Sequence, residues 1–159
     1  MLVNMEVISL TLSLNDPILK RQIIMDHYEN PRNKSLVNDP RYLKVNMNSE
    51  SCIDDIDIQI LVEDNIIKDF RFDGVGCTIS TASTSILSEL VINKTIDEAL
   101  TIIQNYDQML KEEMFDETLL EEAVVFKDVS KQANRIKCAT IGYHGLKELL
   151  MQLRGENHE

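Results

Sequence analysis

The chain has 159 residues, enough for one domain with a core of ordinary size. Hydrophobic residues make up 43% of it and charged residues 27%, which is typical of a globular protein rather than a disordered one. A formal net charge of −11 repels nucleic-acid backbones and anionic membrane surfaces, so neither is an expected partner. No apolar run is long enough to span a bilayer, and the first residues lack the basic start of a signal peptide, so we expect a cytoplasmic protein.

The first expected element is a helix that begins at Asp16 and ends near Asn30. Asp16 can cap the helix, Pro17 suits its first position, and Pro31 disfavours helical geometry at the residue before it. Residues 1–15 are then an N-terminal extension, whose order the sequence leaves open. Residues 16–155 are expected to form one domain, and residues 156–159 a tail.

Three strands are predicted next, over residues 43–47, 56–60 and 66–72. In the second, isoleucines alternate with polar residues, as in a strand with one buried face. Glu63, Asp64 and Asn65 are typical of a turn, so the second and third strands should be antiparallel neighbours. The three strands together form a small meander.

The rest of the chain is expected to be helical. Gly74 and Gly76 mark the turn into a helix that starts at Cys77, and Thr95 with Glu98 forms a capping box for another. Asp116 can cap a shorter helix that runs through Val124. A final helix is predicted over about 132–153, although glycines at 142 and 145 are unfavourable there. The fold class is therefore α+β: a three-stranded antiparallel sheet packed on one face by helices, with a long C-terminal helix.

The cysteines are the candidate functional residues. Cys52 and Asp54 are two apart, so their side chains share one side of an extended chain. Cys77 lies at a helix start, which favours the thiolate, and Cys138 follows Arg135 and Lys137. Three thiolates and one carboxylate are a possible tetrahedral zinc set, with Arg135 as counter-ion. From spacing alone, three unrelated buried cysteines remain the main alternative.

Three sequence blocks narrow this choice. The stretch 74–85, GVGCTISTASTS, closely resembles the G-x-G-C-x-I-S-x-A-S-x-S signature of the SufU and IscU-like (NifU N-terminal-like) iron-sulfur cluster assembly proteins. The stretch 24–33, IMDHYENPRN, resembles the family's N-terminal helix-and-turn motif, and the stretch 135–140, RIKCAT, resembles the segment that bears its last cysteine. The resemblance covers about 17–153 and implies the SufE/NifU-like fold.

Within the family, the chain is most similar to the zinc-dependent SufU branch, because Lys137 precedes Cys138 where scaffolds usually have histidine. A long helical segment between Cys77 and Cys138 agrees. The resemblance implies a sulfurtransferase and desulfurase activator, rather than a conventional small-molecule enzyme. It would take persulfide sulfur from a SufS-like cysteine desulfurase for downstream cluster scaffold proteins.

The resemblance also implies residue roles. Cys52 would be the sulfur acceptor, released from zinc when a desulfurase histidine displaces it. Asp54, Cys77 and Cys138 would keep the ion, and Arg135 would steady the thiolates. Two other functions stay open: an IscU-type scaffold in which the four ligands hold iron or an iron-sulfur cluster, and a non-catalytic zinc-stabilised interaction domain.

Four further features of the sequence need an interpretation. Ile53 stands where the family has glycine in Asn-Pro-x-Cys-Gly-Asp, so we expect a β-branched residue to restrict movement of this loop. We interpret His27 as a surface or hydrogen-bonding residue rather than a fourth ligand. Serines and threonines over 80–85 favour close helix packing. The acidic stretch 112–122 is expected to be a solvated face, with a basic partner surface as the alternative.

Overall fold

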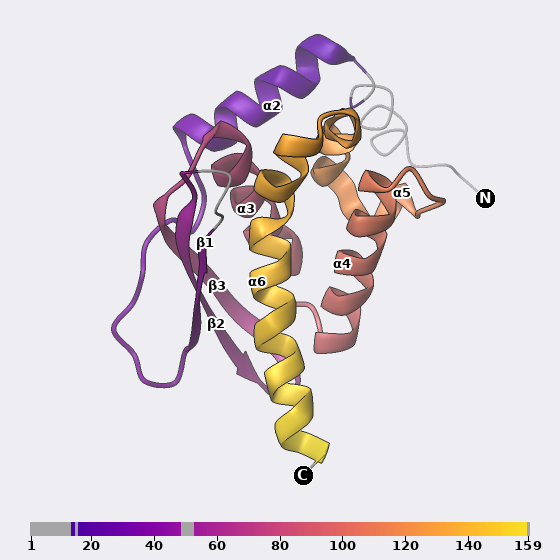
Figure 1. The fold of residues 1–159 in the computed structure, drawn as a ribbon. Helices are drawn as coiled ribbons and strands as arrows, with labels where there is room; N and C mark the ends of the chain where they lie inside the picture. The colour runs from indigo at the N-terminus through magenta and orange to yellow at the C-terminus, as the bar shows by residue number, and fades with distance from the viewer. Residues whose placement is uncertain (1–13, 15, 49–52, 159) are drawn as a thin grey trace, which may run out of the picture.

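Three antiparallel strands lie beside a layer of helices in the computed structural model of the chain (Figure 1). The structure describes residues 14, 16–48 and 53–158, with side chains through residue 155. The strands are β1 (Leu43–Asn48), β2 (Asp55–Glu63) and β3 (Ile66–Val75), in the order β1-β2-β3. Each contains one of the predicted strands, and the α+β fold class is confirmed.

Six helical segments accompany the sheet in the described part of the chain. They are α2 (Pro17–Glu29), α3 (Thr78–Val91), α4 (Ile96–Leu110), α5 (Glu117–Leu120), the 3₁₀ helix η1 (Glu121–Lys131) and α6 (Ala133–His158). The predicted helix through Val124 is wrong in part, because the α-helix ends at Leu120 and a 3₁₀ helix follows. The final helix continues past its predicted end at 153. Within the described residues, no helix has both the length and the apolar character needed to cross a membrane.

Capping side chains explain why several helices begin where they do. The Asp16 carboxylate accepts a hydrogen bond from the Ile18 N–H at 2.9 Å. Thr95 and Glu98 form the predicted capping box, with the Thr95 hydroxyl accepting from the Glu98 N–H at 3.1 Å and the Glu98 carboxylate accepting from the Thr95 N–H at 3.0 Å. Each cap satisfies backbone donors that the helix itself leaves unpaired.

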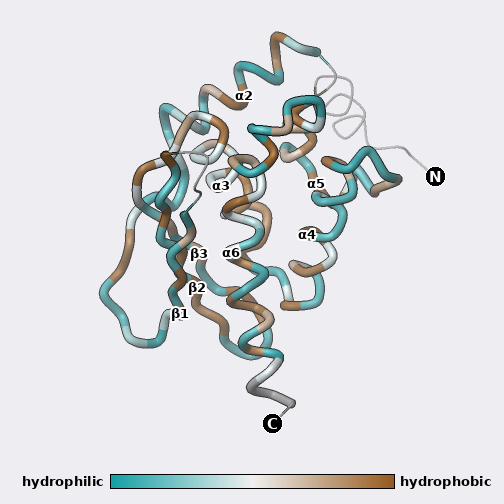
Figure 2. The backbone as a smooth tube through the Cα atoms, viewed as in Figure 1, coloured by the Kyte–Doolittle hydropathy of each residue, from teal (hydrophilic) through white to brown (hydrophobic). Residues whose placement is uncertain are grey.

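The core lies between the sheet and the helices. Alternate residues of β2 and β3, such as Ile58, Ile60 and Phe70, point inward and are fully buried. Figure 2 shows α4 and α6 with hydrophobic and hydrophilic residues interspersed, as expected of helices with one buried side. Tyr106 of α4 and Tyr143 of α6 stack with ring centroids 3.6 Å apart, and burial raises the pKa of both phenols.

The loop between α2 and β1 covers the other face of the sheet. It bows away from the helices in Figure 1 and is fixed by side chains of β2 and β3. The Gln59 amide accepts from the Val37 N–H and donates to the Val37 carbonyl, both at 2.9 Å. The Lys34 ammonium lies 2.8 Å from the Asp73 carboxylate. These contacts leave Gln59 buried on the face that has no helices.

Two glycines let α6 approach its neighbours closely. A Cβ at Gly142 would lie 2.6 Å from the Thr84 hydroxyl oxygen on α3, and one at Gly145 would lie 2.5 Å from Ile58 Cδ1 on β2. Both distances are shorter than real Cβ contacts. The helix therefore tolerates these glycines because close packing offsets their poor helix propensity.

Gly145→Ala is expected to destabilise the protein by about 1–3 kcal/mol, because the added methyl group overpacks the contact with Ile58. Gly155 on the same helix is the matched control, since nothing lies within 4 Å of a Cβ there. Gly155→Ala should be neutral or stabilising by up to about 1 kcal/mol. Urea unfolding of both variants measures the difference, and equal free energies of unfolding would contradict the close approach.

Candidate metal centre

Asp54 is a buried carboxylate at the entrance to β2. It is only 2% exposed, and its Oδ1 atom accepts hydrogen bonds from the Cys77 N–H at 2.9 Å and the Ser80 hydroxyl at 2.8 Å. Its Oδ2 atom is buried without a hydrogen-bond partner among the described residues. Burial of a carboxylate oxygen without a hydrogen-bond partner destabilises the folded protein unless a proton or a cation binds to the oxygen.

Cys77 caps the N-terminus of α3. Its backbone is extended, and its Sγ atom accepts from the Ser80 N–H at 3.4 Å, as an N-cap side chain does. The free N–H groups of the first turn place partial positive charge against the sulfur. The side chain is half-buried, so a metal ion or a partner's side chain can reach it.

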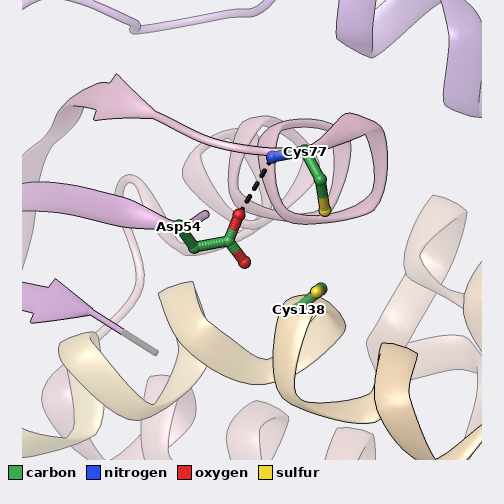
Figure 3. Close-up of side chains that lie close together, drawn as sticks. All are labelled: Asp54, Cys77 and Cys138. Carbon is green, nitrogen blue, oxygen red and sulfur yellow. Dashed lines mark hydrogen bonds between the residues drawn. The ribbon is translucent and has the colours of Figure 1, made fainter. Parts of the chain in front are cut away.

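Cys138 completes a cluster of three candidate ligands. It lies in the second turn of α6 and is 3% exposed. One ligand atom from each of Asp54, Cys77 and Cys138 lies within 4.8 Å of the other two. Figure 3 shows both sulfur atoms and the second carboxylate oxygen of Asp54 directed toward the same space. The structure therefore gathers three of the four predicted ligands, from the start of β2, the N-cap of α3 and the second turn of α6.

Neither Cys52 nor Arg135, the other predicted site residues, is among the ligands of this described cluster. Cys52, the predicted sulfur acceptor and fourth ligand, lies outside the described residues. Arg135 is exposed, and its guanidinium makes no hydrogen bond or ion pair with any described residue, so its role as counter-ion stays a prediction. Ile53 is 69% exposed.

The donor set of this cluster fits zinc. Two sulfurs and one carboxylate oxygen are ligands that zinc accepts, and they leave one tetrahedral position for a further protein ligand or an exchangeable group. The Oδ2 atom of Asp54 has its hydrogen-bonding capacity free for an ion, while its Oδ1 atom is fixed by two donors. Calcium and magnesium fit poorly, because both prefer shells made only of oxygen.

The structure gives roles to two polar residues, Ser80 and His27, that the sequence predicted only in part. Ser80 orients the Asp54 carboxylate, and its position three residues after the N-cap Cys77 was the available signal. His27 is 1% exposed, so the surface interpretation is wrong, whereas the hydrogen-bonding one is confirmed by its 2.8 Å contact with the Ser85 hydroxyl. The serines and threonines over 80–85 are all buried, in agreement with close packing, and the stretch 112–122 is mostly exposed.

Comparisons with known proteins agree with the fold. Residues 19–150 match the NifU-like N-terminal domain, and the chain belongs to this family. The zinc-dependent sulfurtransferase SufU of Bacillus subtilis is 35% identical over 149 residues, which cover 93% of this chain and 100% of that protein. The iron-sulfur cluster assembly scaffold protein IscU of Thermotoga maritima is 30% identical over 132 residues, with coverages of 83% and 92%.

A solved structure extends the similarity to three dimensions. The crystal structure of FiSufU from Fervidobacterium islandicum AW-1, described as an iron-sulfur cluster assembly scaffold protein for the SUF system, superimposes with a TM-score of 0.74. It is 32% identical, and the match covers 81% of this chain and 94% of that one. The resemblance to SufU and IscU-like proteins stated from the motifs is confirmed, and relatives with both kinds of name are present.

Proposed function

We propose that this protein is a zinc-dependent sulfurtransferase of iron-sulfur cluster assembly, which accepts persulfide sulfur at Cys52 from a cysteine desulfurase. The observation that carries the proposal is the buried cluster of Asp54, Cys77 and Cys138, with an Asp54 oxygen that lacks a described hydrogen-bond partner. The similarity to a zinc-dependent sulfurtransferase over 93% of the chain supports it. A reducing cytoplasm, the expected location, would keep the thiols available.

Zinc would be held by Asp54, Cys77 and Cys138 with Cys52 as the fourth ligand, and would supply a redox-inert positive charge that keeps thiols deprotonated. The chain's own residues do the rest. The Cys77 N–H and Ser80 hydroxyl fix the Asp54 carboxylate, and the first turn of α3 faces the Cys77 sulfur. These three residues keep their arrangement when Cys52 turns to the partner.

The transfer step is a thiolate exchange. The Cys52 thiolate attacks the outer sulfur of the desulfurase persulfide, so that a new sulfur–sulfur bond forms on Cys52. The bond to the desulfurase cysteine breaks, and that cysteine leaves as a thiolate, so no electrons are gained or lost overall. Downstream cluster scaffold proteins would then receive the sulfur from Cys52.

An IscU-type scaffold function is the second candidate, because a relative named as a scaffold is 30% identical over 83% of this chain. In that case the same ligands would hold iron or a cluster. Lys137 favours the sulfurtransferase, since the scaffold branch usually has histidine at that position. A non-catalytic zinc-stabilised interaction domain is the third candidate, in which Ile53 would hold the loop fixed.

Incubation of the zinc-loaded protein with a cysteine desulfurase and cysteine is expected to add sulfur to Cys52 and to raise desulfurase turnover. Mass spectrometry of the peptide that contains Cys52 measures the first effect, and alanine production measures the second. Cys52→Ala should abolish both, whereas the neighbouring change Ser51→Ala should preserve them.

Different results would identify the other candidates. A stable visible absorption after anaerobic reconstitution with iron and sulfide, without any rise in turnover, would favour the scaffold. Retained zinc with neither persulfide on Cys52 nor faster turnover would favour the interaction domain. Either result contradicts the sulfurtransferase proposal.

A further inference from the structure

A second cluster of candidate ligands lies away from the cysteines, where α2, α3 and η1 pack against one another. His27 from α2, Glu89 from α3 and Glu122 from η1 each place one ligand atom within 4.8 Å of the other two. We call these residues the imidazole–carboxylate cluster. The Nε2 atom of His27 is 3.9 Å from Glu89 Oε1 and 3.8 Å from Glu122 Oε2.

These distances are long for hydrogen bonds and close to those between ligands of one ion. An N–H donor and a carboxylate normally lie about 2.7–3.2 Å apart. Bonds to zinc of roughly 2.0–2.3 Å place tetrahedral ligand atoms about 3.3–3.8 Å from each other. Small movements of the two glutamate side chains, which are about half exposed, would bring both oxygens into range.

The imidazole is held in a fixed orientation. His27 is 1% exposed, and its Nδ1 atom lies 2.8 Å from the Ser85 hydroxyl on α3. The same hydroxyl oxygen accepts from the Arg32 N–H at 2.8 Å, and its two lone pairs allow it to accept from Nδ1–H as well. In the tautomer that carries the proton on Nδ1, the lone pair is on Nε2, the atom that faces the carboxylates. A histidine oriented through its other nitrogen is typical of metal ligands.

The charge around the cluster is negative. The Arg32 guanidinium lies 2.7 Å from the Asp26 carboxylate and 3.7 Å from the Glu89 carboxylate, so its stronger interaction is with Asp26. His27 and Glu89 each lie in the last turn of an α-helix, where the helix dipole adds further negative potential.

A metal ion could also enter this region. Glu89 and Glu122 line a cavity of about 260 Å³ together with apolar residues of α3 and with Glu121.

From these observations we infer that His27, Glu89 and Glu122 form a second binding site for a divalent transition ion of the zinc class, separate from the cysteines. One imidazole and two carboxylates suit zinc, iron(II) or manganese(II) better than a soft copper(I) ion. Water in the cavity would fill the remaining position.

Cobalt(II) titration of the metal-free, full-length protein tests this inference. An ion among the cysteines gives an intense sulfur-to-cobalt charge-transfer band, whereas an ion on nitrogen and oxygen gives only weak visible bands. We expect a second ion per chain without additional charge-transfer intensity. Glu122→Gln and Glu89→Gln should each weaken its binding by at least about tenfold.

Glu121→Gln is the matched control, because this neighbouring glutamate lines the same cavity but is not in the cluster. It should bind the second ion as the wild type does. The imidazole ¹⁵N signals of His27 should also change on addition of zinc to protein whose cysteine site is already filled. A single ion per chain, equal second-site affinities in Glu122→Gln and Glu121→Gln, or an unchanged His27 would overturn the inference. The charge-transfer band reports separately on the cysteine site.

Discussion

Replacement of both Cys77 and Cys138 with serine is expected to remove the zinc that the cysteine cluster retains through dialysis. A serine hydroxyl stays protonated at neutral pH and cannot replace a thiolate as a ligand. Because the two cysteines belong to α3 and α6, the ion would also join two helices to the start of β2. Loss of the ion should therefore lower stability as well as zinc content.

The size of the stability effect follows from mass action. Zinc present at a hundred times its dissociation constant adds about 2.7 kcal/mol to the free energy of unfolding. A chelator should remove this contribution from the wild type and should lower the stability of the double variant by less. Zinc analysis and urea unfolding, with and without chelator, measure both quantities.

Thr140→Ser serves as the control for a buried change on the same helix, because Thr140 is 5% exposed and does not belong to the ligand cluster. This variant should keep its zinc and its response to the chelator. A zinc content in the double cysteine variant equal to that of the wild type would contradict a site formed by these sulfurs.

Asp54→Asn is expected to lower zinc affinity by at least about tenfold while preserving the metal-free fold. Asparagine keeps a carbonyl oxygen that can accept from the Cys77 N–H and the Ser80 hydroxyl. The asparagine NH₂ group replaces the unpaired Oδ2 atom, carries no charge and presents N–H donors to the ion. Competition with a zinc indicator measures the change in affinity.

Asp54→Ala separates the two roles of this residue. It removes the acceptor for both donors as well as the ligand, so the metal-free protein should lose about 1–3 kcal/mol of stability relative to Asp54→Asn. Urea unfolding of chelator-treated proteins makes the comparison. Equal stabilities of the two variants, or wild-type zinc affinity in Asp54→Asn, would contradict the roles assigned to the two oxygens.

Local signals were enough to predict most of the fold. The helices α2 and α4 begin at the residues whose side chains cap them, Asp16 and Thr95. The alternation of isoleucines in β2 matches its buried face. By contrast, the break between α5 and η1 occurs at Glu121, which has a φ of 47°. Neither glycine nor proline marks this position, so no local pattern predicted it.

The candidate site was predictable only in part, for the same reason. Cys77 could be placed at a helix start from the glycines before it, and the motif resemblance connected it with Asp54 and Cys138. The burial of His27 depends on Ser85, which is 58 residues away in the sequence. A contact of that kind is created by helix packing and has no local sequence pattern.

The glycines of α6 also bear on the position of the Cys138 sulfur. Residues 138, 142 and 145 share one side of the helix, because they are spaced four and three residues apart. On this side, the glycines bring the main chain of α6 against the side chains of Thr84 on α3 and of Ile58 and Met47 on the sheet. The depth of the thiol in the metal centre is therefore set by close packing of the helix one and two turns away. A bulkier residue at 142 would displace the sulfur although it touches none of the ligands.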